Sequence, residues 1–167
     1  KKPGDIYRFA KDVKTGKDID KWETARIATK NAKYIYKFSF LDGVHIGKLE
    51  KAIIATKNAE YIYKFAKDVE DANIERLEDA IIATGNAEYI YEFVFLGGVN
   101  IDKLEEAIIA IGDAEYIYKF AYNVEGAHIE KLRDAIIATG NAEYIYKFAY
   151  YVWKSYIDKL EDAIIAT

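Results

Sequence analysis

One phrase returns along the whole chain and constrains its fold more than any other feature. It reads NAKYIYKF from Asn31 and then NAEYIYKF, NAEYIYEF, DAEYIYKF and NAEYIYKF from positions 58, 86, 113 and 141. The intervals alternate between 27 and 28 residues. A degenerate copy of the phrase, GDIYRF, begins at Gly4. Such a fixed period is typical of tandem repeats. It predicts one repeat domain over residues 1–167, with copies at about 4–30, 31–57, 58–85, 86–112, 113–140 and 141–167.

Each copy carries the signals of two short helices. In the third copy, Asn58 and Asn73 are placed to cap helix N-termini, and Gly85 is placed to end the second helix in a left-handed conformation. Apolar residues recur at helical spacing between these signals, namely Ile62, Phe65, Ala66, Val69, Leu77 and Ile81. One helical hairpin cannot bury such a face alone, so the copies must stack. The sequence predicts an all-α fold, a right- or left-handed αα-solenoid of six two-helix repeats.

The copies resemble tandem αα-hairpin repeats of uncharacterised bacterial proteins, with a pattern similar to A-x-Y-I-Y-x-F-A-x-D-V-x-G-A-x-I-x-x-L-x-x-A-I. The resemblance covers nearly the whole chain, and it implies a repeat type but no activity. The period differs from the about 34 residues of tetratricopeptide repeats and the about 33 of ankyrin repeats, so the partners of those families do not transfer. A recently duplicated natural array and an engineered array both fit the close similarity of the copies.

Composition argues against several classes of partner. The net charge of −4 is opposite to the basic face of a nucleic-acid-binding protein. Without cysteine, the chain has no thiolate nucleophile and no cysteine zinc cluster. No apolar run approaches the roughly 18 residues of a membrane span, and no signal-peptide pattern opens the chain. We therefore expect no nucleic-acid or membrane partner, and the compartment stays open.

Two copies are one residue shorter between their helices. Phe65 is followed four residues later by Val69, whereas Phe38 is followed three residues later by Leu41, and Phe93 by Leu96. Both spacings return to the same helix face, so we expect these leucines to take the place of the valine in the core. Lys30 and Lys57 stand where later copies end in glycine, and we expect them to adopt the left-handed conformation at a cost of about 1 kcal/mol.

The position two residues after each conserved phenylalanine should face solvent, about 200° around the helix from it. Lys11 and Lys67 occupy it in the first and third copies, but the other copies have Phe40, Phe95, Tyr122 and Tyr150. We call these four the ridge residues, because stacking would align them. Exposed aromatic residues of this kind often mark an interaction surface. The alternative is that the rings pack under the following turn.

The last copy replaces its polar turn with aromatic residues. Tyr151 and Trp153 stand where earlier copies are polar, and Tyr156 stands at the cap position of the second helix, whose cap is therefore expected to be lost. We call these three residues the end patch. The chain then closes on AIIAT (163–167), which provides no polar cap for a terminal repeat. Either this end binds another molecule, or the aromatic residues fold over it.

Catalytic and metal-binding candidates are weak. His45 and His128 both take a second-helix N-cap position, three copies apart, and are expected to be capping or surface residues that cannot share a metal ion. Ser39, Asp42 and His45 have the residue types of a catalytic triad, but the fourth copy replaces all three. We expect no catalysis there.

Two further recurring features are expected to be structural. The acidic stretches RLEDA (76–80), KLEEA (103–107) and KLEDA (159–163) are expected to lie on solvated helix faces. The Tyr-Ile-Tyr triplets are expected to pack between copies, with their hydroxyl groups at the rim.

The sequence thus predicts a non-enzymatic scaffold, without cofactor or metal, whose ridge residues and end patch bind a protein or peptide. The alternative is a structural or self-assembling array, natural or engineered, in which the aromatic residues are buried against another copy of the chain. A more distant possibility is a small-molecule site, which an apolar pocket larger than about 300 Å³ would favour.

Overall fold

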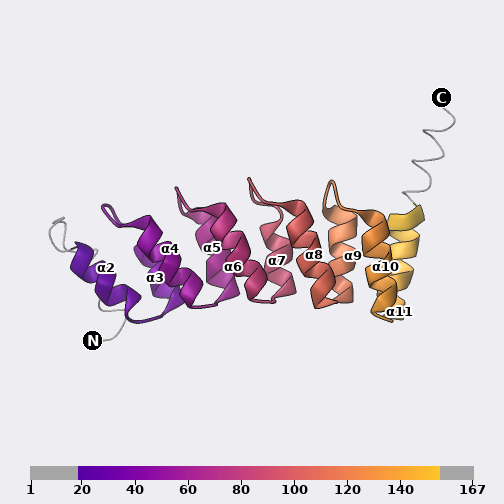
Figure 1. The fold of residues 1–167 in the computed structure, drawn as a ribbon, viewed down its shortest axis with the longest axis horizontal. Coiled ribbons are helices and arrows are strands. Elements are labelled where there is room, and N and C mark those ends of the chain that lie inside the picture. Colours follow the sequence, from indigo (N-terminus) through magenta and orange to yellow (C-terminus); the bar gives the residue numbers. More distant parts are fainter. Residues whose placement is uncertain (1–18, 155–167) are drawn as a thin grey trace, which may run out of the picture. The chain divides into compact units, whose positions relative to one another are not determined.

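The computed structural model describes residues 19–154, and its regular structure within that range is entirely helical (Figure 1). The helices follow one another in antiparallel pairs, which confirms the all-α prediction and the helical-repeat pattern. They are α2 (Ile19–Ile27), α3 (Ala32–Phe38), α4 (Ile46–Ala55), α5 (Ala59–Asp68), α6 (Ile74–Ala83), α7 (Ala87–Phe93), α8 (Ile101–Ile111), α9 (Ala114–Asn123), α10 (Ile129–Ala138), α11 (Ala142–Lys147) and the π-helix η1 (Phe148–Trp153).

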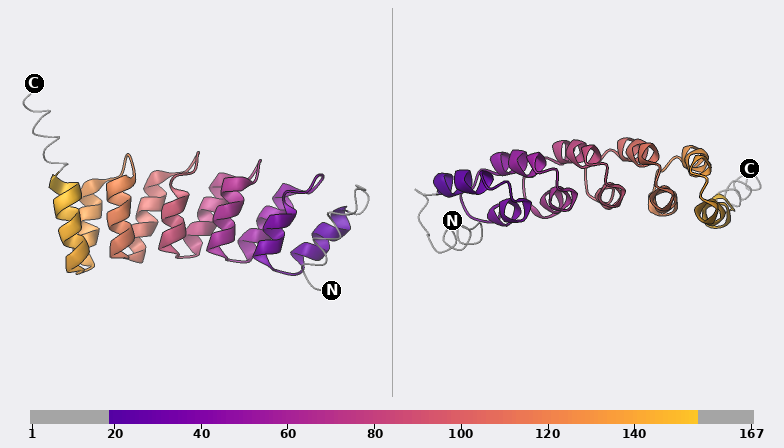
Figure 2. Two further views of the ribbon diagram at one scale, coloured as in Figure 1. Left: turned by 180° about the vertical axis from the view of Figure 1, so that it is seen from behind. Right: turned by 90° about the horizontal axis from the view of Figure 1, so that it is seen from below.

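The chain divides into two compact units. Among the described residues, the first unit holds 19–89 and 96–99, and the second holds 90–95 and 100–154. In the first unit, α2, α4 and α6 contact one another in order and form one layer, while α3 and α5 form the other (Figure 2). In the second unit, α9 contacts α8, α10, α11 and η1. Within each unit every copy therefore packs against the next, as an α-solenoid requires.

Asparagine caps begin the helices where the sequence predicts them. Asn58 Oδ1 accepts the N–H of Tyr61 at 3.1 Å, and Asn73 Oδ1 accepts the N–H of Arg76 at 2.9 Å. These bonds satisfy backbone donors that lack a partner within the helix. The same bond occurs at the start of the first helix in the other described copies, at Asn31, Asn86, Asp113 and Asn141.

A threonine and a left-handed residue join most copies. Thr56 Oγ1 donates to the carbonyl of Ile53 at 2.6 Å and accepts the N–H of Asn58 at 3.3 Å. The residue between the threonine and the asparagine has a positive φ, which is 66° at Gly85 and 55° at Lys57. Lys30 has a φ of 51°. The prediction of left-handed lysines is therefore confirmed.

The core follows the predicted stripes. Ile62, Phe65, Leu77 and Ile81 are fully buried, and the same positions are buried in the neighbouring copies. The shortened copies depart from the prediction, because their first helix ends sooner. In the second copy α3 ends at Phe38, and the fourth copy ends α7 at the equivalent Phe93.

In the shortened copies the residue after the phenylalanine stays buried, as Ala66 is in the third copy, but the leucine does not enter the core. In the second copy the small side chain of Ser39 is buried next to Phe38, and Leu41 is only partly buried. The fourth copy repeats this with Val94 buried and Leu96 partly buried. The expectation that the leucines replace the buried valine is wrong, because Leu41 and Leu96 are only partly buried whereas Val69 is 7% exposed.

Candidate functional site

The four ridge residues are exposed. Phe40, Phe95, Tyr122 and Tyr150 leave 53%, 55%, 57% and 53% of their surface accessible. The alternative in which these rings pack under the turn is therefore wrong. Phe40 belongs to the first unit, and the other three belong to the second.

Each ridge residue lies against the tyrosine four residues before it, one helical turn away. Tyr36 and Phe40 meet edge to face with ring centroids 5.1 Å apart, and Tyr118 and Tyr122 stack at 5.8 Å. Two more pairs repeat these geometries, Tyr91 with Phe95 and Tyr146 with Tyr150. In the third copy, Lys67 Nζ instead lies 5.5 Å from the centre of the Tyr63 ring. The position therefore accepts a cation as well as a ring.

The tyrosines also join neighbouring copies. In the first unit, the second tyrosine of one copy contacts the first tyrosine of the next, with centroid distances of 5.8 Å for Tyr36 and Tyr61 and 5.9 Å for Tyr63 and Tyr89. The second unit repeats the contact, at 6.0 Å for Tyr91 and Tyr116 and at 6.1 Å for Tyr118 and Tyr144. The prediction that these residues pack between copies is confirmed.

Polar contacts hold two of these tyrosines in place. Tyr36 Oη donates to Asp68 Oδ2 at 2.6 Å, and Asn123 Nδ2 donates to Tyr91 Oη at 3.0 Å. Burial, followed by the bond to Asp68, raises the pKa of Tyr36 to about 12. Burial also raises the pKa of Tyr91. Each bond runs from one copy to the next, so it orients the ring that supports a ridge residue.

Lysines flank the aromatic residues and are themselves neutralised. Lys119 Nζ lies 4.6 Å from the centre of the Tyr116 ring and pairs with Glu115 at 2.6 Å. The hydrogen bond from Lys119 lowers the pKa of Glu115. Lys64 and Lys147 repeat the arrangement over Tyr61 and Tyr144. The aromatic surface is thus bordered by ion pairs and not by a net charge of one sign.

The two described members of the end patch have different environments. Tyr151 is 51% exposed and meets Tyr150 edge to face at 4.8 Å, so it extends the surface of the ridge residues in the second unit. Trp153 is partly buried, and the guanidinium of Arg133 lies 4.8 Å from its ring centre. Trp153 therefore packs on its own chain. Tyr156 and the AIIAT end lie outside the described residues.

A row of buried glutamates was missed at the sequence level. The second helices α2, α4, α6 and α8 each bury one glutamate, and these residues are Glu23, Glu50, Glu78 and Glu105. The prediction for the acidic stretches is wrong at Glu78 and Glu105, although their neighbours Asp79 and Glu106 are exposed as expected. Each of these glutamates directly follows a leucine or tryptophan at intervals of 27 or 28 residues, which is the signal that could have revealed them.

Three of the buried glutamates, Glu23, Glu50 and Glu105, cap the second helix of the following copy. Glu50 Oε2 accepts the backbone N–H of Asn73 at 2.8 Å. Glu23 and Glu105 do the same for His45 and His128, each at 2.7 Å. A carboxylate that accepts a backbone N–H at a helix N-terminus is favoured by charge and by the helix dipole. This contact, which we call the carboxylate link, joins successive second helices within each unit.

The candidate triad is not assembled. Ser39 Oγ donates to the carbonyl of Tyr36 at 2.7 Å, and His45 Nδ1 faces Glu23 Oε2 at 3.1 Å. Both histidines occupy the N-cap position as predicted, but neither makes a side-chain cap hydrogen bond. A depression of about 350 Å³ in the first unit, lined by Lys57, Asn58, Ala59, Glu60, Thr84, Asn86 and Tyr89, is mainly polar, so it does not favour a small-molecule site.

Known proteins do not identify this surface. No family model, curated protein or solved structure compared with the chain matches it. Within residues 19–154, each helix is too short or too polar to cross a membrane.

Proposed function

We propose that the chain is a non-enzymatic helical-repeat scaffold whose aromatic surface binds a protein or peptide. The observation that carries this proposal is that Phe95, Tyr122 and Tyr150 occupy the same position in three successive copies of the second unit and are each more than half exposed. Phe40 occupies that position in the first unit.

A ring at this position is not needed to form the first helix of a copy. Lys67 occupies the same position in the third copy, lies over Tyr63, and leaves α5 a regular helix of 10 residues. An exposed ring at this position therefore adds apolar surface without filling the core. Large exposed apolar residues gathered in one place often mark binding surfaces in proteins.

The rings are also held ready for binding. Each is supported by a tyrosine of the same copy. That tyrosine contacts a tyrosine of a neighbouring copy in three of the four cases, Phe40, Phe95 and Tyr122. Side chains already restricted in the free protein lose less entropy when a partner covers them. Aromatic residues are enriched among those that dominate binding energy. Apolar anchors on a peptide or protein would fit between such rings, and the bordering ion pairs would form a polar rim.

Light scattering over a wide concentration range first tests whether the exposed rings serve self-assembly instead of partner binding. The parent chain is compared with a Phe40→Lys, Phe95→Lys double variant, whose new side chains copy the natural Lys67. A monomeric parent is expected. A parent that associates while the variant stays monomeric would assign the rings to a self-assembling scaffold instead.

Selection from a displayed peptide library then tests binding directly. We expect the parent to enrich peptides with apolar anchors and the variant to lose them. Peptides retained equally by both proteins, or no enrichment on the parent, would contradict the proposal. Equal melting temperatures of the two proteins show that the variant is folded.

A further inference from the structure

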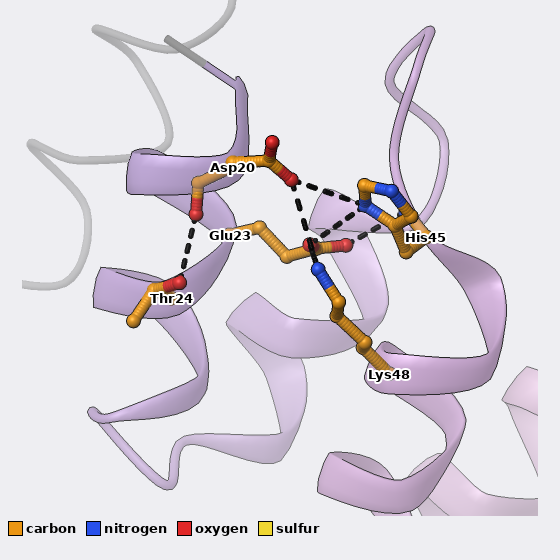
Figure 3. A network of polar contacts seen from close by, with 5 residues as sticks. All are labelled: Asp20, Glu23, Thr24, His45 and Lys48. Carbon is orange, nitrogen blue, oxygen red and sulfur yellow. Dashed lines mark hydrogen bonds and ion pairs between the residues drawn. The ribbon is translucent and has the colours of Figure 1, made fainter.

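A second group of side chains converges where α2 meets the start of α4 (Figure 3). Asp20 and Glu23 project from α2, and His45 is the N-cap residue of α4. His45 Nδ1 lies 3.1 Å from Glu23 Oε2 and 3.3 Å from Asp20 Oδ1. One ligand atom from each of the three residues lies within 4.8 Å of the others.

We propose that Asp20, Glu23 and His45 bind a divalent transition-metal ion of the Zn²⁺ class. Imidazole nitrogen and carboxylate oxygen are ligands that such ions accept, at bond lengths of about 2.0–2.2 Å. Tetrahedral ligands at those bond lengths are about 3.3 Å apart, close to the two separations from His45 Nδ1. Three protein ligands leave the fourth position for water or for an anionic group of a partner.

The two carboxylates already hold a cation at this place. Lys48 Nζ lies 3.4 Å from Glu23 Oε2 and 3.7 Å from Asp20 Oδ1, and its side chain is more than half exposed. Because lysine has a flexible stem, its ammonium group can leave for solvent when a metal ion takes its place. Glu23 keeps its orientation, since its other oxygen accepts the backbone N–H of His45. A hydrogen bond to the oxygen that does not bind the metal holds the carboxylate in the orientation needed for ligation.

The second unit has the same three residue types in a looser arrangement, whose ligand atoms do not all lie within 4.8 Å of one another. His128 Nδ1 lies 3.1 Å from Glu105 Oε1 and 3.7 Å from Asp102 Oδ1. Elsewhere among the copies with a buried glutamate, the residue three positions before it is Gly47 or Glu75, and the next cap is asparagine. Aspartate and histidine therefore occur together or not at all in these copies.

The histidines replace a better cap, which is an independent reason to assign them another role. Asn73 and Asn100 each accept a backbone N–H of their own helix, at 2.9 and 3.1 Å. His45 and His128 make no such bond. Asparagine is among the preferred N-cap residues and histidine is not. Two copies thus give up a cap hydrogen bond and gain a nitrogen ligand that faces two carboxylates.

Calorimetric titration of the full chain with zinc chloride tests the proposal, with Co²⁺ absorption as a report on ligand geometry. The parent is expected to bind one ion, at the cluster of Asp20, Glu23 and His45. A His45→Asn, His128→Asn double variant, which restores the natural cap of the other copies, should bind at least about tenfold more weakly. Without metal, the melting temperature of this variant should equal or exceed that of the parent. A loss of binding would then reflect the missing ligands and not a loss of folding.

Two further variants complete the test. Lys48→Met removes the competing ammonium group and should tighten binding at the cluster. Glu60→Gln removes a surface carboxylate outside the cluster and should leave binding unchanged. If the parent and the double histidine variant bind Zn²⁺ equally, or if neither binds it, the proposal is overturned, and the aromatic surface is unaffected by that result.

Discussion

At the scale of single residues, the residue that joins two copies must adopt a left-handed backbone conformation. Some copies meet this requirement with glycine and others with lysine. Gly85 and Lys57 occupy equivalent positions, with φ of 66° and 55°. A side chain at Gly85 would meet no atom within 4 Å of its Cβ. The difference between glycine and lysine here is therefore one of backbone conformation and not of packing.

Replacing Lys57 with glycine should stabilise the protein by about 1 kcal/mol, because the residue no longer holds a side chain in the left-handed region. Gly85→Lys is the matched control and should lose a similar amount. Urea denaturation of both variants measures the change in the free energy of unfolding. A loss of stability in Lys57→Gly would contradict the assigned strain.

Replacing Phe95 with lysine should leave the melting temperature nearly unchanged and weaken partner binding, since Lys67 already shows how the position holds a lysine. The control is Phe93→Ala, two residues away, where a fully buried ring is removed and about 3–5 kcal/mol should be lost. Thermal unfolding followed by circular dichroism distinguishes the two. If Phe95→Lys melted as early as Phe93→Ala, Phe95 would be a core residue.

Helical periodicity predicts that the Tyr122 ring faces outward, because Tyr122 lies two residues after the buried Phe120 on the same helix. Phe95 is exposed as well, although it lies beyond the end of α7. Periodicity was not enough for Glu50 or Glu105. Their carboxylates are buried by contacts with a residue of the next copy, and local hydropathy carries no information about that neighbour. The partnership of His45 with Asp20 and Glu23 has the same origin.

At the scale of helices, the carboxylate link makes the start of one helix depend on a side chain of another. Glu50→Ala removes the acceptor of the Asn73 N–H and should cost about 1–3 kcal/mol, the usual penalty for an unpaired group in a partly buried place. Hydrogen exchange should quicken at the first amides of α6. The control is Glu60→Ala, which removes only a surface pair with Lys64 and should cost less than about 0.5 kcal/mol. Equal losses in the two variants would show that the link adds nothing.

The contact between α3 and α5 predicts a loss of stability in alkali. The pKa of Tyr36 is about 12 in the folded protein, against about 10 in an unfolded chain. Folding therefore favours the protonated phenol. The protonated Tyr36 therefore contributes fully to the free energy of unfolding below about pH 10, and this contribution is lost as the pH rises toward 12.

Ultraviolet titration of tyrosinate measures this pKa, with Tyr36→Phe identifying the signal. Asp68→Asn keeps a polar partner but removes the negative charge, so it should lower the pKa of Tyr36. An unchanged titration in Asp68→Asn would show that the carboxylate plays no part.

Helix existence was predictable from the repeated caps, but helix ends were less so. The sequence indicates that the second copy is one residue short, yet it does not show that α3 stops at Phe38. That end places Leu41 beyond the helix, where it is only partly buried. The π-helix η1 was not predicted either, since it coincides with the packing of Trp153 on Arg133, a contact between different helices.

At the scale of the whole chain, contacts between neighbouring copies predict modular stability. The pattern of short and long copies repeats after 55 residues, as from Phe38 to Phe93. Deleting residues 31–85 therefore removes two copies and keeps every junction in register. The shortened chain should remain helical, and the urea m-value should fall by about a third, in proportion to the surface buried.

The control deletion, residues 31–72, leaves an odd helix without its partner. It should unfold less cooperatively than the 31–85 deletion in the same urea titration. If both deletions unfolded alike, the two-helix copy would not be the unit of stability.

The carboxylate link also has a direction along the chain. Glu23 serves His45, Glu50 serves Asn73, and Glu105 serves His128, so the acceptor always precedes the donor in sequence. A ribosome makes the chain from its N-terminus, and domains and repeats can fold in that order. As each new second helix emerges during synthesis, the group that caps it has already been made and can already be in position. In these three links, the earlier copy thus provides the group that caps the second helix of the next copy.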